Sequence, residues 1–95
     1  MIEGIFEEMR GIGAVASSDE FSTEWLGRER SYLRGLRAKR RDASPVVLAT
    51  CAVRLLRTAD GLKSAGVPIA DAKQLHLRNM ANRCLEGILA AGARR

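Results

Sequence analysis

Apolar residues recur along this chain at helical spacing, every three or four positions, and no stretch keeps the strict alternation of a strand. Serine and glycine mark the ends of the apolar stretches. Ser17 or Ser18 and the pair Ser44-Pro45 are typical helix starts, and Gly27 is typical of a left-handed C-cap. The pattern therefore predicts an all-α fold of about five helices, at about 2–12, 20–26, 29–38, 45–59 and 70–91.

Each predicted helix has one apolar stripe, and together these stripes supply the expected core. The residues expected to face inward are Ile2, Ile5, Phe6, Met9, Ile12, Phe21, Trp25, Leu26, Leu33, Leu36, Leu48, Cys51, Ala52, Leu55, Leu56, Ala72, Leu75, Met80, Cys84, Leu85, Ile88 and Leu89. Gly61 and the stretch 66–68 predict a break before the last helix. We therefore expect a core of residues 1–62 and a C-terminal helical element of residues 63–95.

Charge is distributed unevenly along the 95 residues. Residues 27–41 carry seven basic side chains and one acid, whereas residues 1–24 carry six acids and one base. A concentrated positive field attracts polyanions, and a helix that is apolar on one side and cationic on the other suits the phosphate-lined major groove of DNA. The alternative interpretation is a solvated, arginine-rich face, which is what most charge runs are.

Residues 2–58 resemble the lambda-repressor-like (Cro/repressor, XRE-type) family of helix-turn-helix DNA-binding proteins. The resemblance is carried, in order, by Leu26-Gly27, Ser31-Tyr32-Leu33 with Leu36, Lys39-Arg40-Arg41, Pro45, and Leu48-x-x-Cys51-Ala52-x-x-Leu55. The chain departs from the family in having Arg28 where an aliphatic residue is usual. Its second helix is one residue longer than usual, and Ala38 or Lys39 stands at a position that is often glycine.

The resemblance implies a role for each basic residue around the third predicted helix. Arg30, Ser31 and Arg34 are expected to point toward base edges in the major groove of double-stranded DNA. Phosphate contacts are expected from Arg28, Arg37, Lys39, Arg40 and Arg41, and from Ser22 or Thr23 near the start of the second helix. Tyr32 is expected either to contact the DNA backbone or to join the core.

The apolar stripe of the C-terminal helix is wider than a small helical core needs. We expect it to form a homodimer interface, through Leu75, Met80, Cys84, Leu85, Ile88 and Leu89, because repressors of this kind bind two-fold symmetric sites. The alternative is that this helix folds back over its own core. Cys51 and Cys84 are expected to be buried small apolar residues, and with a single His76 they predict no metal site and no cofactor.

These features favour a small sequence-specific DNA-binding transcriptional regulator, repressor-like, in the cytoplasm. No apolar run is long enough to span a membrane, and no catalytic constellation is found, so an enzyme is not expected. The competing functions are a helical adaptor or anti-activator, whose basic face would bind an acidic protein partner, and a protein that coats DNA without reading sequence.

Overall fold

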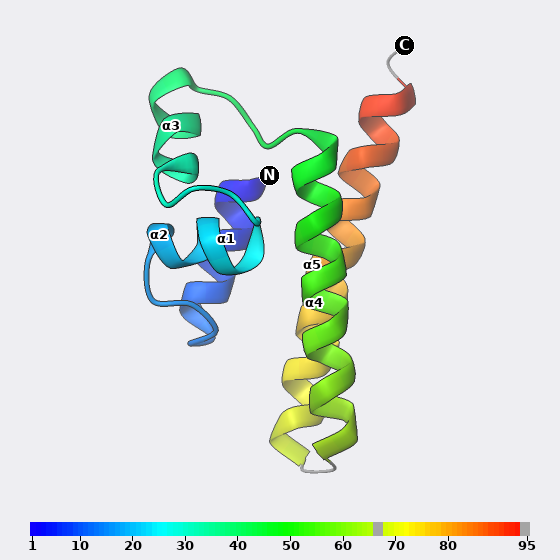
Figure 1. Cartoon of the computed structure of the whole chain (residues 1–95). Coiled ribbons are helices and arrows are strands. Elements are labelled where there is room, and N and C mark those ends of the chain that lie inside the picture. The colour runs from blue at the N-terminus through cyan, green and yellow to red at the C-terminus, as the bar shows by residue number, and fades with distance from the viewer. Residues whose placement is uncertain (66–67, 94–95) are drawn as a thin grey trace.

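The computed structural model is helical throughout its described part, with no strand, which confirms the predicted fold class (Figure 1). It describes the backbone of residues 1–65 and 68–93 and the side chains of residues 1–62 and 72–90. The elements are α1 (Ile2–Gly11), α2 (Ser18–Glu20), the π-helical turn η1 (Phe21–Trp25), α3 (Tyr32–Lys39), α4 (Pro45–Ala65) and α5 (Pro68–Ala93). Because η1 continues α2 directly, the two form one short helix.

The predicted end of the fourth helix near residue 59 was wrong, because α4 continues to Ala65 through Gly61. Glycine costs a helix interior about 1 kcal/mol relative to alanine. Ala59, two residues earlier, is fully buried, and the packing of α4 along α5 outweighs that local cost. The break predicted at residues 66 and 67 lies outside the described residues.

Two long helices, α4 and α5, run side by side as a hairpin, and α1, α2 and α3 gather beside it (Figure 1). At Gly87 of α5, an added Cβ would lie 2.7 Å from the Met1 side chain and in ordinary contact, 3.6 Å, with Cδ1 of Leu48 on α4. One turn further along, Cys51 and Cys84 are both free, buried thiols. The expectation that these cysteines belong to the core is therefore confirmed.

Most of the predicted core is confirmed in the first four helices. The residues that the structure buries there and that the pattern predicted are Ile2, Ile5, Phe6, Met9, Phe21, Leu26, Leu33, Leu48, Cys51, Ala52 and Leu55. Those that are only half-buried against this core are Ile12, Trp25, Tyr32, Leu36 and Leu56. The prediction was less accurate on α5, where Leu75, Leu85 and Leu89 are exposed and the unpredicted Leu77 and Ala81 are buried.

Polar contacts fix α1 between α3, the loop after it and α5. Oδ1 of Asp42 accepts hydrogen bonds from the backbone N–H groups of Ile2, at 3.0 Å, and of Ala43, at 2.8 Å. Toward the C-terminal end of α1, Glu8 forms an ion pair with Arg83 and lies 3.5 Å from the His76 ring. The hydrogen bond from Arg83 lowers the pKa of the Glu8 carboxyl.

Candidate nucleic-acid interface

The helix formed by α2 and η1 begins as predicted. The Oγ of Ser17 accepts a hydrogen bond from the Glu20 N–H at 3.1 Å, which confirms Ser17 as the N-cap. Toward its end the Leu26 N–H donates to the carbonyl of Phe21, five residues back, at 3.2 Å. A π-helical turn of this kind accommodates one more residue than an α-helical turn. The π-helical turn therefore lies in the helix that is one residue longer than the helix-turn-helix family pattern.

Gly27 closes this helix in the left-handed conformation, with φ at +65°, so the predicted C-cap is confirmed. The next N–H, that of Arg28, donates back to the carbonyl of Ser22 at 3.0 Å. This hydrogen bond joins residues six positions apart, one more than the defining bond of a Schellman motif, as the π-helical turn before it allows. The chain thus leaves the second helix in a fixed direction.

Ser22 joins the second helix to α3. It is fully buried: its hydroxyl donates to the Ser18 carbonyl at 2.8 Å and accepts from the Leu33 N–H at 3.1 Å. Leu33 lies in the first turn of α3, where backbone N–H groups have no partner within their own helix. The prediction that Ser22 contacts a phosphate was therefore wrong, because both hydrogen-bonding capacities of its hydroxyl are used inside the protein.

Thr23, the other predicted phosphate contact on this helix, is half-buried. Its hydroxyl lies 3.2 Å from the carbonyls of Asp19 and Glu20 and donates to them. The hydroxyl proton that a phosphate would need is thus held within the helix. The structure therefore does not support the predicted phosphate contact of Thr23.

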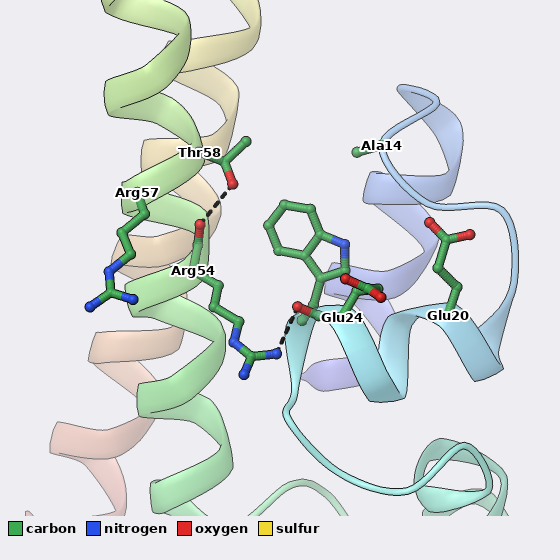
Figure 2. A pocket seen from close by; sticks show the side chains of 7 residues that line it. Ala14, Glu20, Glu24, Arg54, Arg57 and Thr58 are labelled. Carbon is green, nitrogen blue, oxygen red and sulfur yellow. Dashed lines mark hydrogen bonds between the residues drawn. The ribbon is translucent and has the colours of Figure 1, made fainter.

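Arg54 fixes the end of the second helix onto α4. Its Nη1 donates to the carbonyls of Thr23, at 3.1 Å, and Glu24, at 2.8 Å, and Figure 2 shows the side chain reaching from α4 toward Glu24. An added Cβ on Gly27 would lie 3.1 Å from Nη2 of Arg54. The guanidinium thus satisfies helix-end carbonyls and also requires a small residue at the turn. Sequence reasoning missed this residue, because nothing local connects Arg54 with residues about thirty positions earlier.

Between η1 and α4 lies an open groove of about 480 Å³ (Figure 2). Its lining residues are Ala14, Glu20, Glu24, Trp25, Arg54, Arg57 and Thr58. The guanidinium of Arg54 is already engaged with backbone carbonyls, so the groove marks the junction between the second helix and α4. In the described part of the chain, no three His, Cys, Asp or Glu side chains come together as metal ligands.

α3 begins later than predicted, at Tyr32 instead of Glu29 or Arg30. The turn between the two helices is correspondingly longer than the three or four residues expected, and the Tyr32 N–H donates to the Glu29 carbonyl at 3.0 Å within it. Arg30 therefore lies in the turn, and Ser31 is the N-cap residue of α3. Both are exposed, as predicted base-reading residues must be.

The outward side of α3 lies opposite buried Leu33. Helical spacing places Ser31, Arg34, Gly35 and Ala38 on that side, and an added Cβ on Gly35 would meet no atom within 4 Å. Close packing against a neighbouring helix is therefore not the reason for a glycine at position 35.

Arg37 is held by the fold. Its Nε and Nη2 both donate to the carboxylate of Glu3 on α1, and its guanidinium lies 5.5 Å from the centre of the Phe6 ring. The hydrogen bond to Glu3 raises the pKa of Arg37. With this side chain committed to joining α1 and α3, the structure does not support the predicted phosphate contact.

Arg34 and Arg28 have looser partners. The Nε of Arg34 lies 3.2 Å from Oδ1 of Asp19, the second residue of α2, and the Arg34 side chain is 58% exposed. Arg28 lies 3.8 Å from a carboxylate oxygen of Glu29, and its guanidinium is 5.1 Å from the centre of the Tyr32 ring. Both guanidinium groups thus keep donors that face solvent.

Four exposed cations flank α3 without an acidic partner in the described part of the chain. They are Arg30 before the helix, Lys39 at its end, and Arg40 and Arg41 after it. Arg40 is the C-cap residue and has a left-handed backbone, with φ at +52°. The Arg41 N–H donates to the Leu36 carbonyl at 3.0 Å, which fixes the path of the cationic loop.

The predicted dimer residues of α5 fall into two groups. Met80 and Cys84 are fully buried inside the chain, so their assignment to an intermolecular interface was wrong. Ile88 is half-buried against the same core. Leu75, Leu85 and Leu89 are 61%, 41% and 73% exposed. One side of α5 thus folds back over the core of its own chain, as the alternative expected. The opposite side leaves Leu75, Leu85 and Leu89 exposed.

The fold and the site define an all-helical domain in which a short helix and its flanking loops carry cations beside a long helical hairpin. The chain belongs to a family of unknown function, DUF6626, whose match covers residues 2–95. No curated protein and no solved structure matches it. Within its described residues, none of the helices combines the length and the apolar character needed to cross a membrane.

Proposed function

We propose that this protein is a small sequence-specific DNA-binding transcriptional regulator, repressor-like, that inserts α3 into the major groove. The observation that carries the proposal is the exposed cationic surface formed by Arg30, Lys39, Arg40 and Arg41 at the two ends of α3. Displacing condensed counterions from phosphates gives such a surface its main affinity for DNA. We assign these four cations to phosphates on either side of the groove.

The ion pairs around this surface support the assignment. Arg37 is neutralised by Glu3, and Arg83 by Glu8, so two acids of α1 are already paired. The four cations flanking α3 have no such partner among the described residues. A solvated arginine-rich face remains attractive to polyanions only where its charge is not neutralised internally. Here four such cations lie around one helix.

The dimensions of α3 also fit the proposal. Eight residues of α-helix are about 12 Å long, and the major groove of B-DNA is about 12 Å wide. The outward side of α3 presents Ser31 and Arg34, which form hydrogen bonds, with Gly35, which has no side chain and allows close approach. We assign Ser31 and Arg34 to base edges.

We propose that a second copy of the chain packs against exposed apolar side chains of the hairpin. Of the large apolar side chains that the structure exposes among its described residues, all but Met1 lie on α4 or α5. Val46 and Val53 are two turns apart on one side of α4, and Leu75 and Leu89 are four turns apart on one side of α5. A homodimer formed there leaves α3 of each copy free for one half-site of a two-fold symmetric operator.

Selection from a random pool of duplexes tests the proposal. The full chain is incubated with the pool at about 150 mM salt, and bound duplexes are recovered and sequenced over several rounds. We expect enrichment of one motif with two-fold symmetry. Recovery of duplexes without any common motif would indicate a DNA-coating protein. Recovery of none would refute DNA binding and leave the acidic protein partner as the explanation of the basic surface.

A further inference from the structure

Arg34 differs from Arg37 and from the four cations flanking α3 in how it is held, and its ion pair is closer than the 3.8 Å contact of Arg28 with Glu29. The ion pair with Asp19 joins Oδ1 to Nε at 3.2 Å, and neither Nη group at the tip of Arg34 forms a hydrogen bond with the described residues. The carboxylate of Glu3, in contrast, engages both Nε and Nη2 of Arg37. The four flanking cations have no acidic partner in the described chain. Arg34 is therefore oriented but still has free donors.

The neighbouring carboxylate decides what these donors can bind. A phosphate brought to Arg34 would be placed close to the negative charge of Asp19, and like charges at such separations repel. The edge of a guanine carries no net charge, and its O6 and N7 are two acceptors that match an arginine fork. Asp19 thus disfavours a phosphate at Arg34 and tolerates a base.

We infer that Arg34 reads a guanine in the major groove and that Asp19 is the positioning residue that orients it. This inference rests on the proposed DNA-binding function and adds to it the identity of one base. An arginine side chain loses much rotamer freedom when it is immobilised at an interface. Asp19 restricts Arg34 before DNA arrives, so less of that freedom remains to be lost on binding.

The test uses the full chain and the duplex that it selects from a random pool. Each guanine of that site is replaced in turn by 7-deazaguanine, which lacks the N7 acceptor but still pairs with cytosine, and by adenine in an A·T pair. Binding is measured by fluorescence anisotropy for the wild type, Arg34→Ala, Asp19→Asn and the double variant. Glu20→Gln is the matched control, because it removes another first-turn acid of α2, one that forms no ion pair with Arg34.

At one guanine, the wild type should lose about 5- to 150-fold in affinity on replacement by adenine, which is the usual range for a bidentate arginine contact. Arg34→Ala should remove discrimination at that position alone. Asp19→Asn should lower discrimination at the same position by about 2- to 10-fold, the range expected for one side chain that is no longer immobilised. It should add nothing in the double variant, and Glu20→Gln should leave discrimination unchanged.

Three results would overturn the inference. Arg34→Ala could weaken binding to every duplex equally, which would make Arg34 a phosphate contact. Asp19→Asn could tighten binding to every duplex equally, which would make Asp19 only a source of repulsion. Asp19→Asn could also leave discrimination unchanged at the guanine read by Arg34. Failure of the proposed function is distinguishable from all three, because it appears already with the wild type as a pool that yields no motif.

Discussion

Removing the hydroxyl of Ser22 should destabilise the protein although this residue lies in a segment that the sequence assigns to DNA contact. In Ser22→Ala, the Leu33 N–H loses its acceptor at a position where Leu33 is 1% exposed. A buried donor left without a partner costs about 1–3 kcal/mol. The better helix propensity of alanine returns up to about 0.5 kcal/mol. We therefore expect the free energy of unfolding to fall by about 0.5–3 kcal/mol.

Thermal and urea unfolding followed by circular dichroism at 222 nm measure this change. For a chain of this size, each kcal/mol corresponds to a shift in melting temperature of about 4–8 °C. Thr23→Ala is the matched control, because its hydroxyl bonds only to carbonyls of its own helix. That variant should stay within about 0.5 kcal/mol of the wild type. Equal stability of the two variants would refute the bridging role of Ser22, and weaker DNA binding without lost stability would restore the phosphate contact.

Three further predictions concern single positions. Gly35→Ala should stabilise the chain by about 0.5–1 kcal/mol, because the added Cβ meets no atom within 4 Å, yet it should weaken DNA binding. The control Gly61→Ala should stabilise the chain similarly and leave DNA affinity unchanged. Arg40→Gly should raise the free energy of unfolding by about 1 kcal/mol, because glycine adopts the left-handed backbone at this position without strain. The slope of log DNA affinity against log salt should become shallower by about 0.9, and an unchanged slope would exclude a phosphate contact by Arg40. Burial raises the pKa of Asp42, but hydrogen bonds from the Ile2 N–H, the N-terminal ammonium and Ala43 N–H together lower it below its ordinary value. The stability that Asp42 contributes is thus present above about pH 4 and lost as the pH falls through the folded-state pKa. Asp42→Asn should therefore be less stable than the wild type at pH 6, and its stability should fall less steeply with acid. An unchanged acid transition would contradict this role of Asp42.

Local chemistry explains which features could be predicted from the sequence. Ser17 and Gly27 act on backbone groups within a few residues of themselves, so their types and positions were sufficient to predict a cap at each. The buried residues of α1 and most of those in the first half of α4 follow one helical stripe, so helical spacing was sufficient to predict them. The extra residue of the second helix was also visible by comparison with a family pattern, although its π-helical form was not.

The features that were mispredicted depend on contacts between distant residues. Ser22 looked like a surface hydroxyl because nothing in its neighbourhood shows that Leu33 donates to it from another helix. Arg37 looked like a free cation because Glu3, its partner, lies 34 positions away. On α5 the apolar stripe is wider than the side that meets α4, so spacing alone did not separate buried Met80 from exposed Leu75.

Binding of the selected duplex across a salt series tests the central claim most directly. Fluorescence anisotropy compares that duplex with a scrambled one of the same composition. We expect the selected duplex to bind at least ~1000-fold more tightly. Log affinity should fall with log salt at about −0.9 for each of the four cations flanking α3, near −3.6 per chain. Equal affinity for both duplexes would contradict sequence-specific recognition, and absence of binding at about 150 mM salt would contradict DNA binding altogether.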